Sequence, residues 1–217
     1  MTQNQIDAIV KALTAKGIQL EQGLSDDEVI QIEQKFNIKF PPDLQAFLQT
    51  VLPVDFEDDD SELSEEELLN FVSSGYGWVN WRLGLHSEKE SNIIQERLDF
   101  VLESILFGVE YRDFWWHEWG EKPDDLDKCF EIVKTHYQTY PKMIPVFMHR
   151  FIPSTPNELG NPIFSINSTD IIYYGNDLVS YLSGECDFKL SKEFKIPKEP
   201  KRIQFWSDVI DYLDTPL

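Results

Sequence analysis

The chain has 217 residues, 41% of them hydrophobic, and its 19 basic and 39 acidic side chains give a net charge of −20 at pH 7. That length supports one sizeable hydrophobic core rather than two domains, and 15 Phe, 8 Tyr and 6 Trp are typical of a folded chain. The acidic balance disfavours nucleic acid as a partner, because a phosphate backbone is bound by clustered Lys and Arg. It favours fast association with a basic protein.

Three features of the sequence predict a cytoplasmic protein that does not bind a membrane. The first residues, MTQNQIDAIV, lack the basic region and the apolar run of a signal peptide. No window approaches the roughly 18 apolar residues that a membrane span needs. Cys129 and Cys186 lie far apart without a C-x-x-C spacing, so we expect two reduced, buried thiols, with a disulfide as the alternative.

Residues 2–17 have the pattern of a helix at the N-terminus. Thr2 and Gln5 are placed to form a capping box, apolar residues recur at helical spacing, and a glycine ends the pattern. Residues 17–23 predict a linker, so 1–23 are expected to form an N-terminal helical extension of the domain.

The best-specified stretch is 24–52, LSDDEVIQIEQKFNIKFPPDLQAFLQTVL, which predicts two short helices joined at a Pro-Pro corner. Ser25 and Glu28 are placed to form a capping box, and Asn37 is a C-terminal stop. The prolines prevent continuation of the first helix and fit the first turn of the second. The predicted apolar faces are Val29, Ile32 and Phe36 in the first helix and Leu44, Phe47, Leu48 and Val51 in the second.

The stretch 55–67, DFEDDDSELSEEE, contains nine carboxylates. Such a run repels itself and is usually a solvated surface loop, but a docking surface for a cationic partner is an alternative. A calcium loop fits poorly, because Asp60 stands where an EF-hand loop needs glycine. The acidic residues that we predict to contact a partner are Asp58, Asp59, Asp60, Glu62 and Glu65.

The region 53–142 is an expanded middle with helical insertions. Its patterns predict a glycine turn entering a strand at 74–81, a helix at 87–106, and a helix at 123–140 that Asp124 or Asp125 caps. The aromatic stretch 111–119 lies between the two helices, and its three Trp cannot all face one side of a strand. At least one is therefore expected near the surface. Core packing and a partner surface are both open for Trp115, Trp116 and Trp119.

Residues 143–174 consist of short β-rich runs separated by Pro, Asn and Ser, which predict strands of an antiparallel sheet. Arg150 lies between apolar residues in one run, and we expect it to pair with a buried acid. A short helix is expected to open at 176–178, a loop at 186–202 and a closing amphipathic helix at 203–213. The predicted fold class is α+β, with a mostly antiparallel sheet flanked by N-terminal helices, helical insertions and a C-terminal helix.

Two parts of the chain, 24–52 and 143–213, resemble the SUKH superfamily of fungal cell-wall-assembly regulators and bacterial immunity proteins. The family patterns are LS-x-x-E-[IV]-x-x-x-E with [LF]-P-x-D-[LFY]-x-x-FL, and IPV…R[FY]IP with D-I-[IV]-[YF]-Y-[GA]-x-[DN]-[LF]-x-x-[YW]-L. The matching residues are Leu24, Ser25, Glu28, Val29, Glu33, Phe40, Pro41, Asp43, Leu44, Phe47, Leu48, Ile144, Pro145, Val146, Arg150, Phe151, Ile152, Pro153, Asp170, Ile171, Tyr173, Tyr174, Gly175, Asp177, Leu178, Tyr181 and Leu182. The chain departs from the family at Val51-Leu52-Pro53, where members have an Asn-Gly turn.

The resemblance implies a single SUKH-like domain over 1–217 that binds another protein and catalyses no reaction. It implies an immunity protein that neutralises a cognate toxin, often a nuclease. A regulatory adaptor that binds a cellular protein, as in the fungal branch, is the alternative. The expected partner is a basic toxin domain, steered by the acidic residues named above and anchored by the tryptophans.

The sequence contains none of the motifs G-x-x-x-x-G-K-[ST], G-x-G-x-x-G or G-x-S-x-G. The four histidines are scattered without the spacing of metal ligands: His86, His117, His136 and His149. We therefore expect no catalytic residue, cofactor or metal. An enzyme with an unrecognised carboxylate site is a lesser alternative.

Overall fold

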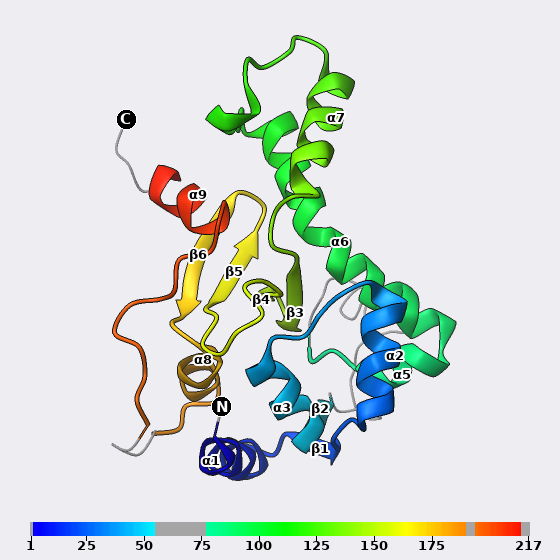
Figure 1. Ribbon diagram of the computed structural model, residues 1–217, viewed down its shortest axis with the longest axis vertical. Helices are drawn as coiled ribbons and strands as arrows, with labels where there is room; N and C mark the ends of the chain where they lie inside the picture. Colours follow the sequence, from blue (N-terminus) through cyan, green and yellow to red (C-terminus); the bar gives the residue numbers. More distant parts are fainter. Residues whose placement is uncertain (1, 55–76, 190–193, 214–217) are drawn as a thin grey trace, which may run out of the picture.

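The computed structural model describes residues 2–54, 77–189 and 194–213, and it has the predicted α+β architecture (Figure 1). The α-helices are α1 (Gln3–Ala15), α2 (Asp26–Phe36), α3 (Pro42–Thr50), α5 (Trp81–His86), α6 (Glu88–Tyr111), α7 (Leu126–Tyr137), α8 (Leu178–Glu185) and α9 (Trp206–Leu213), and a 3₁₀ turn, η1, spans His117–Trp119. The strands are β1 (Gln19–Gln22), β2 (Val51–Val54), β3 (Met143–Phe147), β4 (Arg150–Pro153), β5 (Ile163–Asn167) and β6 (Asp170–Gly175).

The capped helix and the Pro-Pro corner are confirmed, but Val51, predicted on the apolar face of the second helix, begins strand β2 instead. The backbone N–H of Glu28 donates to Ser25 Oγ at 3.2 Å, and the backbone N–H of Ser25 donates to Glu28 Oε2 at 2.8 Å. Asn37 ends α2 in the left-handed conformation, with φ 49°. Pro42 then occupies the first turn of α3, where its missing N–H leaves no hydrogen bond unmade.

The linker predicted at 17–23 is wrong, because it contains strand β1. This strand pairs antiparallel with β2, which follows α3 without a turn. The close passage of the chain past α3 requires Gly23, where a Cβ would overlap the carbonyl group of Gln49. Tertiary pairing therefore makes a strand of QLEQ, whose residues have little β-propensity.

The predicted strands of 143–174 form one antiparallel sheet in the order β3-β4-β5-β6. Successive side chains of a strand point to opposite faces, and here both faces are covered. Ile144, Ile152 and Ile163 pack in a core with α1, α2, α3 and α8. Phe151, Phe164 and the other inward residues of the second face pack in a core with α6, α7 and α9 (Figure 1).

The strand predicted at 74–81 is wrong over the residues that the structure describes. Asn80 accepts a hydrogen bond from the backbone N–H of Leu83 at 3.0 Å, so its side chain caps a helix that starts at Trp81. Trp78 makes a single bridge to Phe147 of β3. Trp81 is buried, and its ring lies edge-on to that of Phe40 with 5.1 Å between the centroids.

The two cysteines, Cys129 and Cys186, are free and buried, as predicted. Within the described ranges 2–54, 77–189 and 194–213, no helix combines the length and the apolar character that crossing a membrane requires. The longest, α6, has 24 residues and carries charged side chains along its exposed face.

A guanidinium clamp holds the start of α2. Arg82 of α5 donates from Nε to Glu28 Oε1 at 2.6 Å and from Nη2 to the Gly23 carbonyl at 2.9 Å. The hydrogen bond from Arg82 lowers the pKa of Glu28 to about 2. Because the folded pKa lies below the ordinary value of 4.5, the stabilisation is complete above pH 4.5 and is lost as the pH falls toward 2.

We predict that Glu28→Gln lowers the free energy of unfolding by about 1 kcal/mol at pH 6, because the variant keeps the size of Glu28 and loses its charge. As the pH falls from 4.5 toward 2, wild-type Glu28 becomes progressively protonated, to about half at pH 2, so the difference between the two proteins should shrink strongly. Urea unfolding of both proteins at pH 6 and pH 2.5 measures it. A difference that stays constant over this range contradicts the assigned pKa.

Candidate protein-interaction surface

The exposed face of α6 carries a column of aromatic side chains. Phe100, Phe107 and Tyr111 are 36%, 43% and 63% exposed, whereas the opposite side of the helix is buried. The rings of Phe107 and Tyr111 lie 4.8 Å apart between centroids. Spacings of seven and four residues place all three on one side of a helix. These three residues are called the aromatic column.

A second column, of carboxylates, runs beside the first. Glu96, Glu103 and Glu110 are all exposed and recur every seven residues. In the part of the chain that the structure describes, none of them forms a salt bridge. Seven residues of α-helix rise about 10.5 Å, so the acidic column extends over about 21 Å of α6.

The aromatic column borders a groove of about 440 Å³. Its walls are α6 on one side and the turn between β5 and β6 on the other. The lining residues are Phe100, Glu103, Ser104, Phe107, Arg112, Asn167 and Ser168. The hollow has aromatic walls, one carboxylate at Glu103 and one guanidinium at Arg112, and it is suited to an apolar side chain of a partner.

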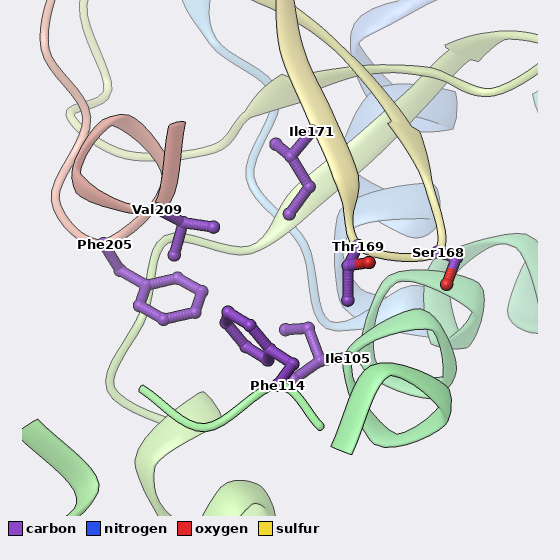
Figure 2. Close-up of a pocket in the computed structure, with 7 residues that line it drawn as sticks. All are labelled: Ile105, Phe114, Ser168, Thr169, Ile171, Phe205 and Val209. Carbon is purple, nitrogen blue, oxygen red and sulfur yellow. The ribbon is translucent and has the colours of Figure 1, made fainter. Parts of the chain in front are cut away.

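The β5–β6 turn is held against α6 by close packing. Gly108 makes this approach possible, because a Cβ there would overlap the Thr169 Cγ2 methyl group and lie 3.4 Å from Phe114 Cβ. Behind the turn, an apolar space closes without room for a water molecule (Figure 2). Its lining residues are Ile105, Phe114, Ser168, Thr169, Ile171, Phe205 and Val209. The turn thus has a closed inner side and an outer side that forms the groove.

We predict that Gly108→Ala lowers the free energy of unfolding by about 1–3 kcal/mol, because the new methyl group overpacks the contact with Thr169. Ala is the better helix former by about 1 kcal/mol, so a loss of stability isolates the packing effect. Gly184→Ala in α8 is the matched control, since a Cβ there meets nothing within 4 Å. Urea unfolding measures both variants, and equal shifts for the two contradict the close approach at Gly108.

Two of the three tryptophans predicted as partner anchors lie inside the molecule. Trp116 is 3% and Trp119 5% exposed, and Trp119 Nε1 donates to the hydroxyl oxygen of Tyr140 at 2.9 Å. Trp115 is partly exposed and donates from Nε1 to the Gly120 carbonyl at 2.8 Å. The three rings form the end of the core between α6 and α9. A partner-binding role for them stays a prediction, in which Trp115 has the most accessible ring.

The predicted acidic contact residues Asp58, Asp59, Asp60, Glu62 and Glu65 lie outside the residues that the structure describes. Sequence reasoning missed the two columns of α6. Their signal was present: Phe100 and Phe107 lie seven residues apart, outside the apolar face that Ile94, Val101 and Ile105 define. Large aromatics on the polar side of an amphipathic helix indicate an additional contact.

Apart from the surface of α6, a cluster of polar side chains surrounds Arg150 between the sheet and α8. Its guanidinium lies 3.6 Å from the ring centroid of Tyr174, donates to Ser165 Oγ at 2.8 Å and has Nε 4.0 Å from Glu185 Oε2. Tyr181 is buried beside them, and desolvation raises the pKa of its phenol. Arg150 thus pairs with an acid at long range, but Glu185 is partly buried rather than buried as predicted, and the contact links β4 to α8.

Comparisons with protein-family models, with curated proteins and with solved structures found no match to this chain.

Proposed function

We propose that this chain is a non-enzymatic protein-binding domain that captures a basic protein, and that it acts in the cytoplasm as an immunity protein neutralising a cognate toxin. The observation that carries the proposal is the aromatic column beside the acidic column on α6. Exposed aromatic residues in a hollow are typical anchors of protein interfaces. Carboxylates that form no salt bridge among the described residues favour a partner that brings Lys or Arg.

The charge of the whole chain supports the same partner. A net charge of −20 raises the rate of encounter with a cationic protein and lowers it for an acidic one. A nuclease toxin needs a basic surface to grip nucleic acid, so an acidic protein that covers this surface blocks the substrate. The resemblance of 24–52 and 143–213 to SUKH proteins gives the proposal its biological class.

The test is co-expression of this chain with the toxin candidate encoded by the adjacent gene. We expect wild-type protein to protect the cells and to co-purify with the toxin, and Phe107→Asp to do neither. Leu159→Asp is the matched control, because Leu159 is 58% exposed and lies outside α6. Equal protection by wild type and Phe107→Asp overturns the assigned surface. If the chain binds a cellular protein and does not protect cells from the toxin, the regulatory adaptor is the better assignment.

A further inference from the structure

The two columns of α6 share a seven-residue spacing, except that Tyr111 follows Phe107 by four residues. Phe100 and Phe107 are seven residues apart, and so are Glu96, Glu103 and Glu110. A residue seven positions along a straight helix returns to within about 20° of the same direction, so each column runs almost parallel to the helix axis. The face therefore presents two straight, adjacent rows, with a spacing of about 10.5 Å along the acidic row and between Phe100 and Phe107.

We infer, on the basis of the proposed function, that the partner presents an amphipathic basic α-helix to this face. Its apolar residues and its Lys or Arg residues recur every seven positions, in two adjacent rows. An apolar side chain of that helix enters the groove between Phe107 and Asn167. The cations stand opposite Glu96, Glu103 and Glu110, as charged residues do beside the apolar seam of a coiled coil.

The spacing favours a helix over an extended strand. Side chains on one face of a strand recur every two residues, or about 6.6 Å, which does not match the spacing of about 10.5 Å along the acidic column. A second helix repeats at the same interval as α6 and stays in register along its length. The 24 residues of α6 give such a partner about 36 Å of helix to follow.

The charges favour a different protein over a second copy of this chain. An antiparallel two-fold dimer through this face would bring the acidic columns of both copies together. Like charges at an interface repel, and each copy adds a net charge of −20. A basic helix removes this repulsion.

Three synthetic peptides of about 28 residues test the inference, since four heptads are long enough to form a stable helix. The first has Leu and Lys in adjacent rows at seven-residue spacing. The second has the same composition with the rows scrambled, and the third has Glu in place of Lys. Fluorescence anisotropy with the full chain measures their affinities at low and high salt.

We expect the first peptide to bind about tenfold or more tightly than the scrambled one and to lose about tenfold on Phe107→Ala, but nothing on Leu159→Ala. Equal affinities of the first two peptides overturn the inference, because binding would then depend on the charge of the peptide and not on the arrangement of its rows. Dimerisation of the chain that Phe107→Ala abolishes also overturns it, in favour of a second copy. If the peptides fail while toxin capture still depends on Phe107, the helical partner is wrong and the proposed function stands. If substitution of Phe107 leaves toxin capture unchanged, the proposed surface is itself wrong.

Discussion

The double substitution Phe107→Ala and Tyr111→Ala is expected to weaken binding of the partner by about 100-fold, while the free energy of unfolding changes by at most about 1 kcal/mol. Both side chains are exposed, at 43% and 63%, and their rings contact each other rather than the core. Their removal therefore takes little packing from the folded chain. In the proposed complex the same rings would supply the apolar contact beside the groove. Calorimetric titration of the partner measures the affinity, and urea unfolding measures the stability.

The control for this pair is Leu159→Ala with Ile196→Ala. These residues are 58% and 40% exposed and lie outside α6, so they remove a similar exposed apolar area from another part of the surface. Partner affinity should be unchanged in the control. A loss of equal size in both double variants indicates a nonspecific contribution of exposed apolar surface and contradicts the role of the aromatic column.

Arg150→Ala is expected to lower the free energy of unfolding by about 3 kcal/mol, because it leaves Glu185 partly buried without its cation. The side chains of Arg150 and Glu185 are only 11% and 22% exposed, and Glu185 Oε2 accepts no hydrogen bond among the described residues. The substitution also removes the hydrogen bond to Ser165 and the stacking on Tyr174. Urea unfolding at pH 7 measures the loss.

A double-mutant cycle isolates the charge term in this cluster. Adding Glu185→Gln to Arg150→Ala removes the unpaired charge, so we expect it to restore about 1 kcal/mol or more. The single variant Glu185→Gln should be less damaging than Arg150→Ala, because the guanidinium keeps its contacts with Ser165 and Tyr174. Additive losses in the double variant contradict a coupling between the two residues.

Local signals in the sequence predict much of this fold. The capping box of Ser25 and Glu28 and the left-handed Asn37 depend only on neighbouring residues, so they appear where the pattern places them. The runs at 143–174 alternate between two buried faces and form the expected antiparallel sheet. The helix predicted at 87–106 extends to Tyr111, because Phe107 and Gly108 continue it to the contact with the β5–β6 turn.

The failures occur where distant contacts decide the structure. The QLEQ strand β1 forms because it pairs with β2. The residues of 17–23 by themselves carry no information about this distant partner. Trp81 has the β-propensity of a large aromatic, but the Asn80 cap starts a helix there and the rings of Phe36 and Phe40 enclose it. Tertiary context overrides propensity at both places.

The proposed interaction surface could be predicted only in part. The composition shows the excess of acidic residues. The sequence predicts the acidic contacts at 55–67 and the apolar anchors at the tryptophans of 111–119. The aromatic column needed the structure, since the exposure of Phe107 depends on where α7 and the β5–β6 turn cover α6. A one-dimensional pattern identifies the surplus aromatic residues but not the groove beside them.

Hydroxyl-radical footprinting of the chain, free and bound to its partner, tests the central claim most directly, because it reports the solvent exposure of each aromatic ring. Phe107 and Tyr111 should be oxidised several-fold more slowly in the complex. Tyr212 of α9, 49% exposed, is the internal reference and should react at the same rate in both states. Protection of Tyr212 with unchanged oxidation of Phe107 and Tyr111 would contradict a partner-binding face on α6.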